Sequence, residues 1–175
     1  MKNIIDSCNK CSLHSLDINK KDIKKGYGKL YGWKIGDEIK YIFVGMNPSY
    51  NRFEGLEYTF GGYDFNKGTG IEFIKLLKDI DVLKDSYITN VVKCSSFDNK
   101  IKSENVKSCL EIFKEEIKEN NPKMIIALGN DVYDFLINEN LGVEIIKIWH
   151  PNYVFSYNRE KINDYKKIIE ELCND

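Results

Sequence analysis

The sequence predicts an α/β fold: a three-layer sandwich in which a central, four-stranded, mainly parallel sheet is flanked by helices. Four short apolar runs alternate along the chain with helical patterns, and this alternation is typical of such a sheet. The chain has 175 residues, the length of one domain, and shows no internal repeat, low-complexity segment or linker. We therefore expect a single domain over residues 1–175.

The first half of the chain holds two predicted strands and one predicted helix. Tyr41 to Val44 and Tyr87 to Val92 are short apolar runs of the kind that form buried strands. Between them, Ile71 to Leu77 follows a helical pattern after Gly70. A strand, a helix and a second strand in this order are typical of a parallel sheet covered by helices.

The second half continues the same alternation. Apolar residues fall at helical spacing over residues 106–117, and Ser103 is the expected N-cap of that helix. Met124 to Leu128 and Val143 to Trp149 are the third and fourth predicted strands, with a helix beginning between them after Gly129. A last amphipathic helix is indicated by Ile162, Tyr165, Ile169 and Leu172.

The composition indicates a water-soluble globular protein but does not indicate which kind of partner it binds. Hydrophobic residues make up 42% and charged residues 30% of the chain, as in an ordinary water-soluble globular protein. No apolar run approaches a membrane span, and residues 1–11 lack the apolar core of a secretory signal, so we expect a cytoplasmic protein. A net charge of −1 neither favours nor excludes nucleic acid, because a small basic face can be offset elsewhere.

Cysteines suggest a metal or iron–sulfur site. Cys8 and Cys11 form a C-x2-C pair, and Cys94 and Cys109 form a second pair separated by 14 residues. In a reducing compartment, four such thiols are expected to hold zinc or an iron–sulfur cluster, and the wide second spacing favours the cluster without deciding between them. The alternative is a short structural loop plus two buried cysteines. Cys173 has no partner in this pattern.

Three polar segments follow predicted strands, and parallel strands bring such segments to one edge of a sheet. The first strand runs into the tight turn Gly45 to Ser49, which leaves Asn47 at the edge. Asn90 lies on the second strand, and the fourth delivers His150, followed by Pro151. Each residue alone has an ordinary structural explanation. Their joint placement predicts a ligand site.

Five segments, spread over nearly the whole chain, carry one family resemblance. They are Cys8-x2-Cys11-Ser12-Leu13, Tyr87 to Cys94, Cys109, Pro122 to Gly129 and His150 to Tyr153. Together they resemble the uracil-DNA glycosylase superfamily, most closely its iron–sulfur branch, usually called family 4. The resemblance implies a 4Fe–4S cluster, with zinc as the less expected occupant, on Cys8, Cys11, Cys94 and Cys109.

The first catalytic motif departs from family 4, which has a glutamate and an alanine where this chain has Met46 and Asn47. GMNPS is instead similar to the motif of the single-strand-selective and mismatch-type enzymes. This resemblance implies that Asn47 orients the attacking water and that Gly45, Met46 and Ser49 line the base site. Ser49 stands where the classical uracil enzyme has a bulky aromatic that blocks the thymine methyl. Damaged bases other than uracil therefore remain possible substrates.

The remaining site residues are also assigned by resemblance. Phe60, with Phe65 as a second candidate, stands where the superfamily places the ring that stacks on the extracted base, although core packing would explain either ring. Asn90 would bind the Watson–Crick edge of the base, and His150 would stabilise the departing base. Asn152 replaces a serine that holds phosphate. The candidates for a wedge that fills the gap left by the base are Tyr153, Val154, Phe155 and Tyr157, although ordinary surface aromatics in a loop would explain them equally well.

The function implied is that of a monofunctional DNA glycosylase. It would hydrolyse the bond between deoxyribose and uracil, or a related damaged base, as a monomer acting on lesion-containing DNA in base excision repair. Two alternatives stay open: a lesion-binding module without turnover, and a relative that traps DNA covalently through attack by His150 on the sugar.

Overall fold

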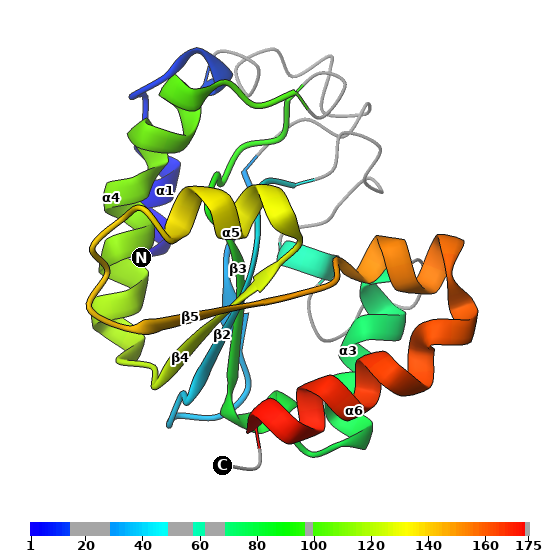
Figure 1. Cartoon of the computed structure of the whole chain (residues 1–175). Coiled ribbons are helices and arrows are strands. Elements are labelled where there is room, and N and C mark those ends of the chain that lie inside the picture. Colours follow the sequence, from blue (N-terminus) through cyan, green and yellow to red (C-terminus); the bar gives the residue numbers. More distant parts are fainter. Residues whose placement is uncertain (15–28, 49–57, 62–68, 97–99, 174–175) are drawn as a thin grey trace.

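The computed structural model describes residues 1–14, 29–48, 58–61, 69–96 and 100–173. Its centre is a five-stranded sheet with the strand order β1-β3-β2-β4-β5 (Figure 1). β2, β3, β4 and β5 run parallel, whereas β1 pairs with β3 in the antiparallel direction. The α/β fold is confirmed. The strands are β1 (Trp33–Lys34), β2 (Tyr41–Gly45), β3 (Ser86–Asn90), β4 (Met124–Leu128) and β5 (Glu144–Ile148).

The prediction of four strands was one short, because β1 has only two residues. Trp33 and Lys34 lie opposite Ile88 and Tyr87 of β3. So short a strand leaves no alternating pattern in the sequence, and it exists because the edge of β3 offers it hydrogen-bonding groups. The other four strands lie within two residues of their predicted bounds.

Both faces of the sheet are covered by helices, as the three-layer prediction requires. Along β2, Tyr41 and Phe43 point into an apolar core shared with α3 and α6, whereas Ile42 and Val44 point into a second core shared with α4 and α5. Figure 1 shows α3 and α6 on one side of the sheet and α4 on the other. The helices are α1 (Lys2–Asp6), α3 (Thr69–Asp79), α4 (Ser103–Asn120), α5 (Asn130–Leu136) and α6 (Ile162–Cys173).

The start of α4 differs from the prediction by one residue. Lys102, not Ser103, is the N-cap, with extended backbone angles of φ −86° and ψ 150°. The side-chain oxygen of Asn105 accepts the backbone N–H of Lys102 at 3.0 Å, which closes the first turn one residue earlier than the serine would. At the other end, Asn121 adopts a left-handed conformation and its N–H reaches the carbonyl of Ile117.

Within the described ranges, no helix has the length and apolar character needed to cross a membrane.

Candidate active site

The carboxyl ends of the parallel strands bring four of the predicted site residues to one place. Gly45 at the end of β2 is the register partner of Asn90 at the end of β3. His150 follows the end of β5, and the ring of Phe60 lies 6.4 Å from its imidazole, measured between centroids. We refer to Gly45, Phe60, Asn90 and His150 as the candidate base site.

Phe60 is held in an unusual backbone conformation. Its φ of 55° lies in the left-handed region, which side-chain-bearing residues adopt rarely and at a cost. The first turn of α3 packs against it so closely that a Cβ on Gly70 would lie 2.8 Å from the Phe60 carbonyl oxygen. The Phe60 ring is partly buried, 5.6 Å from the ring of Phe73. It therefore serves core packing on one side while approaching His150. Phe65, the second candidate, lies outside the described residues.

The turn that carries Phe60 is anchored by the strand that the sequence did not reveal. The indole N–H of Trp33, in β1, donates to the carbonyl of Thr59 at 2.8 Å, and the Thr59 N–H donates to the carbonyl of Tyr31 at 2.9 Å. β1 thus connects this turn to the edge of the sheet.

Asn90 is buried, with only 4% of its surface exposed, and both ends of its amide are constrained. Its Nδ2 donates to the hydroxyl of Thr59 at 3.2 Å. Its Oδ1 lies so close to Gly45 that a Cβ at that position would be 2.5 Å away. A glycine is required at position 45 for this reason. Thr59 was not singled out from the sequence, because only the folded turn shows that its hydroxyl meets Asn90.

His150 is arranged as a hydrogen-bond donor. The backbone N–H of Asn152 donates to Nδ1 at 3.1 Å, so the neutral ring carries its proton on Nε2. The residue as a whole is exposed, yet the protein around the imidazole desolvates it and lowers its pKa. Because the ordinary value is 6.5, the ring is neutral at pH 7. A neutral imidazole with a proton on Nε2 can stabilise developing negative charge by donation.

The first motif forms a partly buried turn. Asn47 donates from Nδ2 to the carbonyl of Pro48 at 2.9 Å, which leaves its side-chain carbonyl as the end able to accept from a water molecule. The carbonyl of Met46 accepts the N–H of Val92 at 2.8 Å and ties the turn to the segment after β3. Ser49 lies outside the described residues.

The segment after His150 separates the four wedge candidates into two groups. Val154 and Phe155 are buried in the core, so neither can enter DNA. Tyr153 and Tyr157 are 42% and 76% exposed. Asn152, expected to hold phosphate, is exposed and accepts the hydroxyl of Ser156 at 2.9 Å, so its side-chain nitrogen is the end left to donate.

Two exposed aromatic rings and one partly buried lysine flank His150, and two of these three residues, Trp149 and Lys161, were not predicted as site residues. The ring of Trp149 lies 6.2 Å from that of Tyr153. The ammonium of Lys161 lies 4.9 Å from the centre of the Trp149 ring and 5.8 Å from that of Tyr153. Trp149 directly precedes His150, which is the one signal that the sequence offered for it. Such surfaces can stack on bases and attract phosphates.

Two of the predicted ligand cysteines, Cys8 and Cys11, lie near a third, Cys109, and we call these three together with Cys94 the cysteine corner. Cys11, Cys94 and Cys109 belong to the same apolar core. Burial, together with the nearby Cys11 and Cys8 thiols, raises the pKa of Cys109. The donor set suits zinc or iron–sulfur chemistry. No group of three or more potential ligands in the described part of the chain has an arrangement that could hold a metal ion, so the cofactor stays a prediction.

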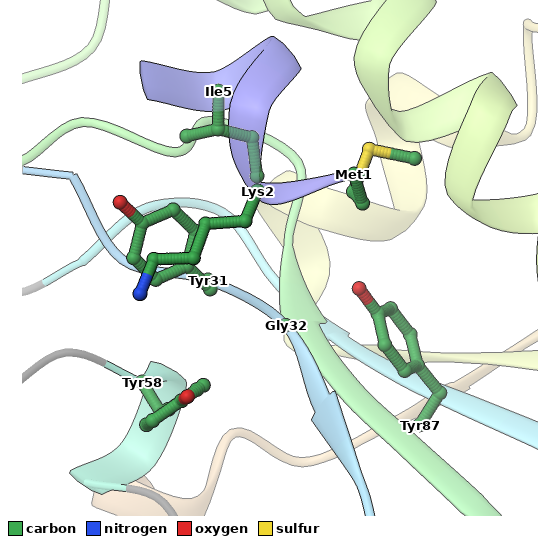
Figure 2. Close-up of a pocket in the computed structure, with 7 residues that line it drawn as sticks. All are labelled: Met1, Lys2, Ile5, Tyr31, Gly32, Tyr58 and Tyr87. Carbon is green, nitrogen blue, oxygen red and sulfur yellow. The ribbon is translucent and has the colours of Figure 1, made fainter.

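A cavity of about 150 Å³ lies outside the candidate base site. Figure 2 shows its lining, in which Tyr31, Tyr58 and Tyr87 surround the opening and Lys2 lies over the ring of Tyr31. None of the predicted site residues lines it. Tyr58 directly precedes Thr59, and so the cavity and the candidate base site share the turn at residues 58–61.

The chain is similar to known proteins at the level of family and of fold. The family model described as the uracil DNA glycosylase superfamily matches residues 33–173. No curated protein matches the chain. The crystal structure of wild-type SMUG2 from Pedobacter heparinus is similar, with a TM-score of 0.52 and 16% identity over 79% of this chain and 77% of that one. At this identity the likeness concerns the fold alone.

Proposed function

Because this chain belongs to the uracil DNA glycosylase superfamily, we propose that it hydrolyses the N-glycosidic bond of uracil, or of a related damaged base, in DNA. The observation that carries the proposal is the convergence of Phe60, Asn90 and His150 at the carboxyl edge of the sheet. A stacking ring, a base-reading amide and a neutral imidazole donor are the three groups that this reaction requires.

Base recognition follows from the first two of these groups. A target base in a duplex must leave the stack before an enzyme can reach its glycosidic bond. Phe60 offers an aromatic ring to the extracted base, and the Asn90 amide offers one acceptor and one donor to its Watson–Crick edge. Uracil presents an N–H and a carbonyl there, whereas cytosine presents an acceptor and an amino group. A fixed amide therefore distinguishes them, because the wrong base leaves buried polar groups unpaired.

Bond cleavage uses His150 and Asn47. As the glycosidic bond breaks, its electron pair moves onto the base, and the His150 Nε2–H donates to the base oxygen where negative charge develops. Water adds to C1′ of the sugar and gives up a proton to solvent, which leaves an abasic site. An amide takes up no proton at neutral pH, so Asn47 acts by orienting this water through its carbonyl oxygen.

DNA contact extends from the base site across the exposed surface beside it. Asn152 can donate its side-chain N–H to a phosphate oxygen. Tyr153 and Tyr157 are the two exposed candidates for the wedge, and Lys161 adds a positive charge beside Tyr153. This surface supports a DNA partner although the whole chain carries a net charge of −1.

The finer classification is also a proposal. We assign the chain to an iron–sulfur branch like family 4 with a first motif of the single-strand-selective or mismatch type. Cys8, Cys11, Cys94 and Cys109 would hold a 4Fe–4S cluster, with zinc as the alternative. Such a group would supply structural support, linking residues 8–11 to the segment after β3 and to α4. The nearness of Cys8 and Cys11 to Cys109, and the core that Cys94 shares with Cys109, support this assignment.

The test is excision from a labelled oligonucleotide that contains one uracil, followed by alkaline cleavage of abasic sites. The protein is purified anaerobically, and Asn47→Ala and His150→Ala are assayed beside it. We expect a shorter strand with the wild type and a loss of about 100-fold or more in each variant. Asn138→Ala is the matched control, because Asn138 is exposed and its side chain donates to the carbonyl of Asp134, one turn earlier in the chain.

Each remaining outcome points to one of the alternatives. Intact DNA with a measurable affinity for uracil-containing strands would favour a lesion-binding module. A protein–DNA adduct that resists denaturation would favour covalent capture by His150. The bond from Asn152 to Nδ1 disfavours capture, since it occupies the lone pair that a neutral imidazole would use for attack.

A further inference from the structure

Directly beside Asn90 lies an ion pair that is buried completely. Lys93 Nζ and Glu116 Oε2 are 2.5 Å apart, and the two side chains are 1% and 0% exposed. Burying both charges is costly, and apolar residues of similar size often stabilise a protein as much or more. The presence of this pair therefore calls for an explanation other than stability.

The contacts of the pair centre on β3. Lys93 donates to the Thr89 hydroxyl at 2.8 Å and to the main-chain carbonyl of Asn90. Glu116, on α4, accepts from the Thr89 hydroxyl at 3.1 Å and from the Tyr87 hydroxyl at 3.1 Å. The pair thus binds the last residues of β3 to the helix that covers this face of the sheet.

The position of the pair relative to Asn90 is what matters for function. Side chains alternate along a strand, so Tyr87 and Thr89 point toward α4 while the Asn90 amide points to the opposite side, toward Thr59. Lys93 holds the Asn90 carbonyl from one side, and Thr59 holds its amide from the other. Asn90 is therefore fixed through both its main chain and its side chain.

We propose that the Lys93–Glu116 pair is a positioning device that sets the location of the Asn90 amide for base recognition. The effect of this pair on catalysis rests on the proposed function, because it requires that Asn90 binds the base. A shift of the Asn90 peptide moves the amide away from the base edge, and a misplacement of about 1 Å in an enzyme site can cost about 100-fold in rate. Neither residue touches the base in this proposal.

The decisive variant is the double substitution Lys93→Met with Glu116→Leu. Single substitutions leave an unpaired buried charge and can unfold the protein, whereas the double variant removes both charges together. The matched control is Lys114→Met with Glu111→Leu, which removes an exposed ion pair of 3.0 Å from the same helix. Unfolding midpoint, iron content and steady-state excision of uracil are measured for both.

We expect the double variant to unfold at or above the wild-type midpoint and to keep its iron content, yet to lose about tenfold or more in kcat/KM. Its preference for uracil over cytosine should fall as well. The control should match the wild type in every measurement. Wild-type stability together with wild-type kcat/KM in the Lys93/Glu116 variant would overturn the proposal, since the pair would then be purely structural.

A second readout separates this proposal from the proposed function. The side-chain amide of Asn90 gives a nitrogen–proton NMR signal, assigned by its disappearance in Asn90→Asp. In the Lys93/Glu116 variant this signal should shift or broaden, and in the control it should not. If the wild type removes no uracil but the signal moves, the proposed function fails and the positioning role stands. An unmoved signal overturns the positioning role whatever the activity.

Discussion

The candidate base site and the cysteine corner lie on the same framework but differ in how far the chain alone completes them. Phe60, Asn90 and His150 are held by hydrogen bonds and close packing with other residues of the chain. Cys8 and Cys11 lie near Cys109, and no group of three or more potential ligands among the described residues has an arrangement that could hold a metal. Burial first, and then the nearby Cys11 and Cys8 thiols, raise the pKa of Cys109, so a metal that binds this thiol must displace its proton.

This difference teaches that strand register can align a polar site, whereas thiol ligands must give up their protons to the cation that they bind. Three predictions test the contrast, beginning with the largest expected effect.

Gly45→Ala should disable the base site without unfolding the protein. The added Cβ would lie 2.5 Å from Asn90 Oδ1, so the amide must move from its place beside Thr59. We expect excision of uracil to fall by about 100-fold, measured as kcat/KM, with an unfolding midpoint close to the wild type. Activity within twofold of the wild type would show that the base site tolerates movement and is less complete than the structure indicates.

Cys109→Ser should affect the cysteine corner first. If the proposed 4Fe–4S cluster is bound, losing one of its four ligands would release it, so iron content and visible absorbance should drop and the free energy of unfolding should fall by about 4 kcal/mol. Cys173→Ser is the control, since Cys173 lies at the end of α6, away from the corner. Equal iron content in the two variants would remove Cys109 from the ligand set.

The pH dependence of uracil excision should report the protonation state of His150. Near neutral pH, where the ring stays neutral, the rate should change little. The folded protein lowers the pKa of His150 through desolvation, so the neutral ring persists below the ordinary value of 6.5. Because the pKa of His150 is lower in the folded than in the unfolded state, its contribution to stability is present above the pKa of the unfolded state. That contribution is lost as the pH falls through the pKa of the folded state. We expect nearly constant kcat from pH 8 to 6.5.

Below the lowered pKa, kcat should fall by about tenfold per pH unit. Protonation places a hydrogen on Nδ1 against the N–H of Asn152, and two facing donors displace the ring. His150→Gln should remove this acid limb from the profile. A rate that rises on acidification would mean that the imidazolium, not the neutral ring, stabilises the leaving base.

Much of the framework was predictable from sequence patterns. Apolar runs of strand length alternating with helical stripes indicated the parallel strands and the helices on them, since each pattern reflects which faces are buried. The same patterns placed Asn47, Asn90 and His150 at strand ends, and parallel strands necessarily bring such ends together. Strand β1 escaped because two residues carry no periodic signal.

What only the tertiary structure decided are the contacts between segments distant in the chain. Thr59 contacts Asn90 although 31 positions separate them in the chain, and Lys93 contacts Glu116 across 23 positions. No local sequence pattern links either pair. The left-handed backbone of Phe60 depends on the packing of Gly70 against it. The sequence by itself determined which groups reach the edge of the sheet, because local periodicity encodes burial. Their orientation depends on long-range neighbours, and so it was decided only by the folded chain.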